Sequence, residues 1–111
     1  MHELGLCSSI VDAVERRAGD REVAAVRVRV GRLHHVHPEA FDQSFGVAAM
    51  GTVASGATAE LILLPVRMRC SSCESTWESE QIEVACPKCG AVDVELVGGD
   101  ELVLESIEYR V

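Results

Sequence analysis

Hydrophobic residues recur along the chain at two different periods, and these periods predict its helices and strands. In residues 4–18, Leu6, Ile10 and Val14 lie about one helical turn apart, which predicts an amphipathic helix with one buried face. Two arginines fall in the last turn, where positive charge favours the helix dipole, and Gly19 follows as a stop. We therefore expect the first element to be a helix.

A strand with one solvent-facing side follows this helix. In residues 22–31, valines alternate with Arg27 and Arg29, and a period of two is typical of a half-buried strand. A second helix is predicted to begin at Pro38, because proline suits the first helical position. Its buried face contains four apolar residues: Phe41, Phe45, Ala48 and Ala49.

The later part of the chain predicts two more strands with a polar insert between them. Residues 59–69 form a long apolar run, which predicts one strand, and Pro65 inside it indicates an edge position or a bulge. Residues 101–111 predict the closing strand. Residues 70–89 contain almost no large apolar side chain except Trp77, so this short segment needs a staple in order to fold.

Four of the five cysteines form two pairs with the spacing of a metal site. Each pair has the pattern C-x2-C, and twelve residues separate the pairs; the cysteines are Cys70, Cys73, Cys86 and Cys89. Two residues between thiolates let both sulfurs bind one ion, and the loop between the pairs is long enough for a hairpin. We expect a zinc ion bound by four thiolates, which leave no open position, so the site is structural.

The two pairs differ in their turn residues. The second pair reads CPKCG, where Pro87 bends the turn and Gly90 can take a positive φ. The first pair reads CSSCE and has neither residue, so we expect its geometry to be less ideal. Iron in a rubredoxin-like electron-transfer site uses the same kind of pairs, but Trp77 is the only aromatic residue nearby. Zinc is favoured, and iron stays the alternative.

Together these elements predict an α+β fold, in which two helices pack on a small mixed three-stranded sheet with an inserted zinc-ribbon-like subdomain. We expect an α/β domain of residues 1–67 plus 98–111 and a zinc-binding domain of residues 68–97. An insert between two strands of one sheet is easily accommodated, because its two ends lie close together.

Charge and composition argue against several classes of function. The formal net charge is −8 and the basic residues are scattered, whereas a nucleic-acid-binding surface needs clustered Lys and Arg. No apolar run approaches the roughly 20 residues of a membrane helix, and the first residues lack the basic stretch of a signal peptide. We therefore expect a cytoplasmic protein that binds neither nucleic acid nor membrane. No nucleophile–base pair, phosphate loop or open metal position indicates an enzyme.

Histidines provide candidate ligands outside the cysteine pairs. His2 can combine its imidazole with the terminal amine and backbone nitrogens to chelate a square-planar metal such as Ni(II) or Cu(II). His34, His35 and His37 cluster after the first strand, where His35 and His37 share one side of an extended chain and are candidate metal ligands. The alternatives are a solvated His2 and a polar loop in which His37 caps the second helix. Cys7, the fifth cysteine, is expected to be a small buried hydrophobic residue.

Several short motifs occur in an order that is typical of one protein family. They are MHEL at residues 1–4, LC at 6–7, GRL at 31–33, VHPEAF at 36–41, the two cysteine pairs with the second reading CPKC, and SIE at 106–108 in the closing strand. This combination resembles the HypA family of hydrogenase and urease maturation factors, which are nickel metallochaperones. The resemblance covers essentially the whole chain.

The resemblance implies roles for particular residues. His2 supplies an imidazole to nickel, backbone nitrogens around His2 and Glu3 complete much of a planar site, and the four cysteines bind zinc. Residues 1–67 plus 98–111 are then the nickel-binding domain, with Ni(II) as cargo and zinc as the structural ion. The resemblance implies no metal-binding role for His34, His35 and His37.

The resemblance also implies partners. Family members pass nickel, together with a maturation GTPase, to the large subunit of nickel–iron hydrogenase, and some serve urease through urease accessory proteins. A homodimer is left open. The alternative function is a zinc-ribbon protein-interaction module that carries no nickel.

Overall fold

Residues 2–111 are described by a computed structural model, in which the chain divides into two compact units. The first unit contains the chain up to Arg29, Val36–Ile62 and Val103–Val111. The second unit contains Val30–His35 and Leu63–Leu102, and so includes all of the predicted zinc segment. The assignment of nickel and zinc to separate domains stays a prediction.

Two helices of the first unit pack against each other. α1, His2–Ala18, begins slightly before the predicted helix and buries residues such as Ile10 on one face. α2, Pro38–Ala49, begins at the predicted proline and buries Phe41 and Phe45. No helix within residues 2–111 is long and apolar enough to cross a membrane.

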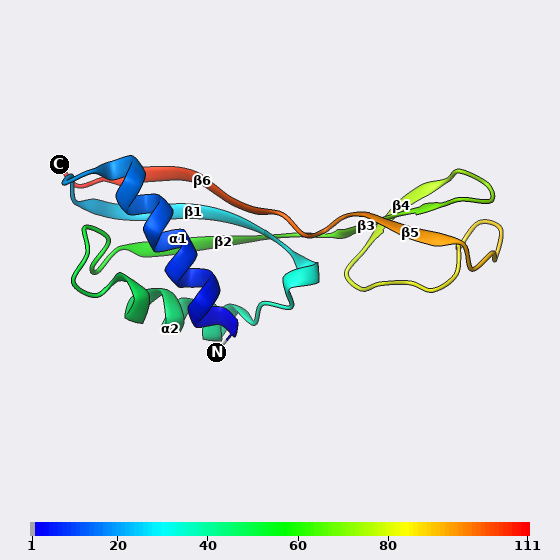
Figure 1. Cartoon of the computed structure of the whole chain (residues 1–111), viewed down its shortest axis with the longest axis horizontal. Helices are drawn as coiled ribbons and strands as arrows, with labels where there is room; N and C mark the ends of the chain where they lie inside the picture. Colours follow the sequence, from blue (N-terminus) through cyan, green and yellow to red (C-terminus); the bar gives the residue numbers. More distant parts are fainter. Residues whose placement is uncertain (1) are drawn as a thin grey trace. The chain divides into compact units, whose positions relative to one another are not determined.

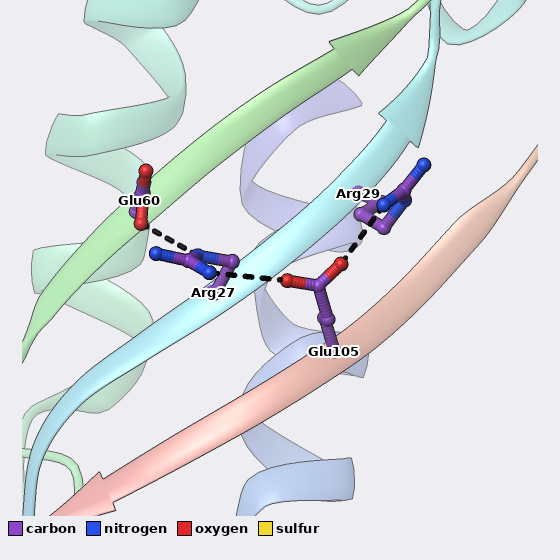
Figure 2. Close-up of polar contacts among 4 residues, drawn as sticks. All are labelled: Arg27, Arg29, Glu60 and Glu105. Carbon is purple, nitrogen blue, oxygen red and sulfur yellow. Dashed lines mark hydrogen bonds and ion pairs between the residues drawn. The ribbon is translucent and has the colours of Figure 1, made fainter.

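A sheet of three strands in the order β2-β1-β6 covers one side of these helices (Figure 1). The strands are β1, Val23–Gly31; β2, Thr58–Leu64; and β6, Leu102–Tyr109. β1 and β2 point the same way and β6 points the opposite way (Figure 2), so the sheet is mixed as predicted. Both helices lie behind the sheet in this view, and Val26 and Val28 of β1 are buried in the core.

The open face of this sheet has a ladder of ion pairs that joins its three strands (Figure 2). Arg27 on β1 contacts Glu60 on β2 at 2.7 Å and Glu105 on β6 at 3.5 Å. Arg29 contacts the other oxygen of Glu105 at 3.0 Å. These are the two arginines that the alternating pattern placed on the solvent-facing side of the strand. Exposed pairs of this kind stabilise a fold weakly, but they favour this one alignment of the strands.

The apolar run at residues 59–69 forms two strands, and the prediction of a single strand is wrong. β2 ends at Leu64, and β3, Val66–Cys70, begins after Pro65. Pro65 has no N–H to donate and its ring fixes φ, so the ladder stops at this residue. The two halves consequently join different sheets, β2 at an edge of one and β3 at the centre of the other.

The second unit is built on the sheet β4-β3-β5 (Figure 1). β4, Thr76–Ser79, and β5, Val94–Gly98, both pair antiparallel with β3. Met68 at the centre of β3 lies opposite Trp77 on one side and Leu96 on the other. Met68 is fully buried whereas Leu96 is 46% exposed, so this unit has a small apolar core.

A 3-10 turn, Arg32–His34, follows β1 and belongs to the second unit. The N–H of Gly31 donates to the carbonyl of Glu101 at 2.7 Å, and the N–H of Leu33 donates to that of Gly99 at 2.8 Å. A Cβ on Gly31 would collide with the Gly99 carbonyl. Glycine is therefore required at the start of the GRL motif, because the backbones approach too closely for any side chain.

The ion-pair ladder predicts a specific pH dependence. A hydrogen bond from Arg29, together with the charges of Arg29 and Arg27, lowers the pKa of Glu105. Such a carboxylate stabilises the folded chain above its unfolded-state pKa, and this contribution is lost as pH falls through the lower folded-state pKa. Between about pH 6 and pH 3 the wild type should therefore lose more free energy of unfolding than Glu105→Gln.

Urea unfolding at each pH measures this difference. Glu108→Gln is the matched control, because Glu108 is exposed on the same strand and forms no ion pair among residues 2–111. This control should follow the wild type. Equal pH profiles for Glu105→Gln and the wild type would show that the ladder does not stabilise the fold.

Candidate metal centres

Four sulfur atoms converge in the second unit, at the four cysteines of the two pairs. The sulfurs of Cys70, Cys73, Cys86 and Cys89 all lie within 4.8 Å of one another. The distance is 3.7 Å from Cys70 to Cys89 and 3.7 Å from Cys73 to Cys86. A tetrahedral zinc site with Zn–S bonds of about 2.3 Å has sulfur–sulfur distances of about 3.8 Å. The four sulfurs therefore fit one tetrahedral ion, which they would enclose completely.

Each cysteine pair lies in a turn, and the two turns, residues 70–75 and 86–91, have the same hydrogen bonds. In both, the N–H of the first cysteine donates to the carbonyl five residues later, at 2.9 Å and 2.8 Å. Its carbonyl accepts from the N–H four residues later, at 2.8 Å in each turn. Chain segments with different sequences thus provide two nearly equivalent halves of one site.

The residue after the second cysteine has a positive φ in both turns. Gly90 has a φ of 77°, as expected, and Glu74 takes the equivalent position with a φ of 63°. This conformation costs a residue other than glycine roughly 1 kcal/mol or more. The exposed Glu74 side chain pairs with Arg69 at 3.0 Å. The first turn is the less ideal one, because a glutamate takes a conformation that favours glycine.

Hydrogen bonds to the sulfurs of Cys73 and Cys86 favour the thiolate form of these two cysteines. The Ser75 hydroxyl lies 3.0 Å from the sulfur of Cys73 and 3.4 Å from that of Cys86, which also accepts the N–H of Lys88 at 3.4 Å. The hydroxyl of Ser75, and after it the N–H groups of Cys89 and Lys88, lower the pKa of Cys86 to about 6. The same hydroxyl lowers the pKa of Cys73. Thiolates are the metal-binding form of cysteine, so the surroundings of Cys73 and Cys86 suit a metal ion.

His2 and Glu3 lie in the first turn of α1, in the first unit. The His2 side chain is 48% exposed, and its Nδ1 lies 3.7 Å from Oε2 of Glu3. The same oxygen accepts a hydrogen bond of 3.3 Å from the backbone N–H of His37, which precedes α2. This hydrogen bond is the main cause that lowers the pKa of Glu3, so the carboxylate stays charged. Glu3 therefore joins the starts of the two helices while the adjacent imidazole remains accessible.

The cluster of histidines after β1 does not form an extended segment, and the expectation that His35 and His37 share one side of it is wrong. His34 ends the 3-10 turn, and its Nε2 lies 2.8 Å from the carbonyl oxygen of Asp100. His35 has a φ of 53°, in the left-handed region, which turns the backbone. His37 takes the cap position of α2, but its side chain makes no capping hydrogen bond. Across residues 2–111, the four cysteines are the only group of three or more side chains placed to hold a metal.

Cys7 lies in the core of the first unit. It is fully buried, and its sulfur donates a hydrogen bond of 3.5 Å to the carbonyl of Phe41. Burial, and secondarily the charge of Glu3, raises the pKa of the Cys7 thiol to about 11. This confirms the expectation of a small buried hydrophobic residue.

Two contacts of these sites were not expected from the sequence. One is the contact of Ser75 with sulfurs from both pairs, and the other joins Glu3 to the backbone of His37. No sequence pattern indicates that Ser75, two residues after Cys73, also contacts the distant Cys86. The contact between Glu3 and His37 joins the motifs MHEL and VHPEAF, and neither motif alone indicates it.

The equivalence of the two turns can be tested by substitution. Gly90→Ala forces a side chain into the left-handed region, so we expect a loss of about 1 kcal/mol or more in the zinc-loaded protein. Glu74→Gly should change stability little, because two effects of about 1 kcal/mol each oppose one another. Glycine relieves the backbone strain at this position, but it also raises the conformational entropy of the unfolded chain. Thermal unfolding of the zinc-loaded variants measures both. A loss from Glu74→Gly as large as that from Gly90→Ala would contradict the equivalence.

Comparison with known sequences now gives the family. The chain matches the family described as hydrogenase/urease nickel incorporation, metallochaperone, hypA, over residues 1–109. It is 37% identical to a hydrogenase maturation factor HypA from Rhodopseudomonas palustris (strain BisB5), over 97% of this chain and 98% of that protein. A protein of the same name from Desulfitobacterium hafniense (strain DSM 10664 / DCB-2) is 33% identical, over 99% of each chain.

A solved structure shows the same fold. The solution structure of the Ni metallochaperone HypA from Helicobacter pylori matches with a TM-score of 0.66 at 21% identity, and the match covers 98% of this chain and 97% of that one. The helices, the two small sheets and the four-cysteine cluster agree with the α+β fold predicted from the sequence. With both the sequence and the fold matched along nearly their whole length, the chain belongs to the HypA family of metallochaperones for nickel incorporation into hydrogenase and urease.

Proposed function

We propose that this protein carries Ni(II) at His2 and delivers it for the maturation of nickel–iron hydrogenase. The observation that carries the proposal is the family match over residues 1–109, which aligns nearly the whole chain with a nickel metallochaperone family. The imidazole of His2 is accessible at the start of α1. It is the proposed side-chain ligand of the cargo ion.

The backbone around His2 and Glu3 supplies further nitrogen donors in this proposal. The first N–H groups of a helix have no carbonyl acceptor within that helix, so nickel binding there breaks no helical hydrogen bond. Nitrogen ligands in a plane are the geometry that Ni(II) favours. The Glu3 side chain accepts the N–H of His37, and we assign it to holding the first turn of α1, with its backbone toward nickel.

We assign zinc to the four cysteines, as a structural ion. Their sulfurs fit a tetrahedron and leave no position for water or substrate. Such a closed cage suits an ion that stays in place, whereas the accessible His2 suits an ion that must be passed on. The function proposed is therefore binding and delivery, and the protein is not an enzyme.

The proposed partners follow from this role in maturation. They are a nickel-handling GTPase and the large subunit of nickel–iron hydrogenase, with urease and its accessory proteins as the second class of client. The proposed location is the cytoplasm, and a homodimer is a possible working form. A zinc-ribbon interaction module or a rubredoxin-like electron carrier would use the cysteines but leave His2 without a role.

Nickel titration of His2→Ala tests the proposal. The variant should bind Ni(II) at least about tenfold more weakly than the wild type, since even loss of an outer partner of a ligand costs this much. Calorimetry measures the affinity, and zinc content should not change. His35→Ala is the matched control, because His35 is also exposed, and it should bind nickel like the wild type.

The pH dependence gives a second reading of the same titration. An imidazole must be neutral to bind a metal, so wild-type affinity should decrease as pH falls from about 8 to about 5.5. His2→Ala should bind nickel more weakly than the wild type at every pH in this range, because the variant lacks the imidazole. Tight nickel binding by His2→Ala, equal to that of the wild type, would exclude His2 as the ligand and with it the proposed site.

Removal of zinc by a chelator tests the structural role of the four cysteines. Because the binding free energy of a structural ion is folding free energy, residues 68–97 should lose protection against hydrogen exchange. α1 and α2 should stay protected, since their core contains no zinc ligand. Readdition of zinc should restore protection. Equal loss in α1 and in residues 68–97 would contradict a local structural role.

A further inference from the structure

The hydroxyl of Ser75 contacts one sulfur from each cysteine pair. Its oxygen lies 3.0 Å from the sulfur of Cys73, in its own turn, and 3.4 Å from the sulfur of Cys86, in the other turn. These two sulfurs are themselves 3.7 Å apart. Ser75 is half-buried, so its hydroxyl is partly shielded from competing water.

The second turn has no such contact, although its backbone is equivalent. Ala91 takes the position that corresponds to Ser75, as the residue whose carbonyl accepts the N–H of the first cysteine of its turn. Alanine has no hydroxyl. The hydroxyl is therefore not needed to form this kind of turn, and its contact with two sulfurs calls for another explanation.

We propose that Ser75 is a positioning residue of the zinc centre, whose hydroxyl hydrogen-bonds to the sulfurs of Cys73 and Cys86 and so holds the two cysteine pairs together. The inference rests on the assignment of zinc to the four cysteines. Four thiolates around one divalent ion leave a net negative charge on the site. A hydroxyl that donates a hydrogen bond to a sulfur stabilises this charge. A serine hydroxyl has one proton, so it donates to one of the two sulfurs at a time.

The position of Ser75 in the turn supports this role. Its backbone carbonyl accepts the N–H of Cys70 at 2.9 Å, which fixes the residue beside the metal ligands. The adjacent Glu74 has the left-handed conformation that brings the chain back toward the sulfurs. The conformation of Glu74 thus turns the chain, and this turn places the Ser75 hydroxyl next to a sulfur of each cysteine pair.

Competition for zinc between the full-length protein and a chromophoric chelator tests the proposal. Removal of the hydroxyl in Ser75→Ala should weaken zinc binding about 10- to 100-fold, the usual effect of losing an outer partner of a metal ligand. Ser72→Ala is the matched control. Ser72 is in the same turn, but its hydroxyl donates to Asp93 at 3.0 Å, and this variant should bind zinc like the wild type.

A pair of variants with the same shape separates the hydroxyl from packing. Ser75→Thr keeps the hydroxyl and Ser75→Val replaces it by a methyl group of similar volume. Substitution of Co(II) for zinc adds a spectroscopic readout, since the sulfur-to-metal charge-transfer bands respond to hydrogen bonds at sulfur. The threonine variant should keep the wild-type bands and affinity, and the valine variant should shift the bands and lose affinity. This pair decides the question even if the alanine variant fails to fold.

The outcomes that overturn the proposal are distinct from those that overturn the zinc site. Equal zinc affinity in Ser75→Ala and the wild type, equal behaviour of the threonine and valine variants, or an equal loss in Ser72→Ala would each exclude the role of Ser75. A wild-type protein that holds no stoichiometric zinc would instead refute the assignment of the four cysteines.

Discussion

The second unit depends on the meeting of four sulfur atoms within 4.8 Å of one another. Its sheet has one fully buried methionine at the centre, whereas apolar side chains such as Ile82, Val84 and Val92 are between 50% and 79% exposed. So little buried apolar surface does not offset the entropy of ordering the segment. Metal binding supplies the missing free energy of folding. The matching turns at residues 70–75 and 86–91 place the four sulfurs for it.

The two candidate metal sites have opposite chemistry, and this contrast suits a metal carrier. The four cysteines form a closed set of soft ligands, two of which are buried, so an ion bound there exchanges poorly. His2, the proposed nickel ligand, is accessible at the start of a helix whose own core, around Phe41 and Phe45, contains no candidate metal ligand cluster among residues 2–111. In the proposed arrangement the structural ion and the cargo ion bind different kinds of ligand, which disfavours exchange of one ion for the other.

Most elements of the fold were predictable because they follow simple periodic patterns. The alternation of valine with Arg27 and Arg29 located β1, and the cysteine spacing located the zinc-ribbon-like insert. The division of residues 59–69 into two strands was not predicted, because Pro65 is compatible with a bulge, an edge or a break and only tertiary pairing decides among them. The conformation of Glu74 and the contacts of Ser75 were also missed, since they depend on where the chain returns in three dimensions.

X-ray absorption at the nickel and zinc edges of the fully loaded protein tests the central claim most directly, because it examines each ion in one sample. The account predicts zinc surrounded by four sulfurs at about 2.3 Å, and nickel surrounded by nitrogen and oxygen ligands that include an imidazole. Sulfur scattering at the nickel edge, or fewer than four sulfurs at the zinc edge, would contradict the separation of the structural ion from the cargo ion.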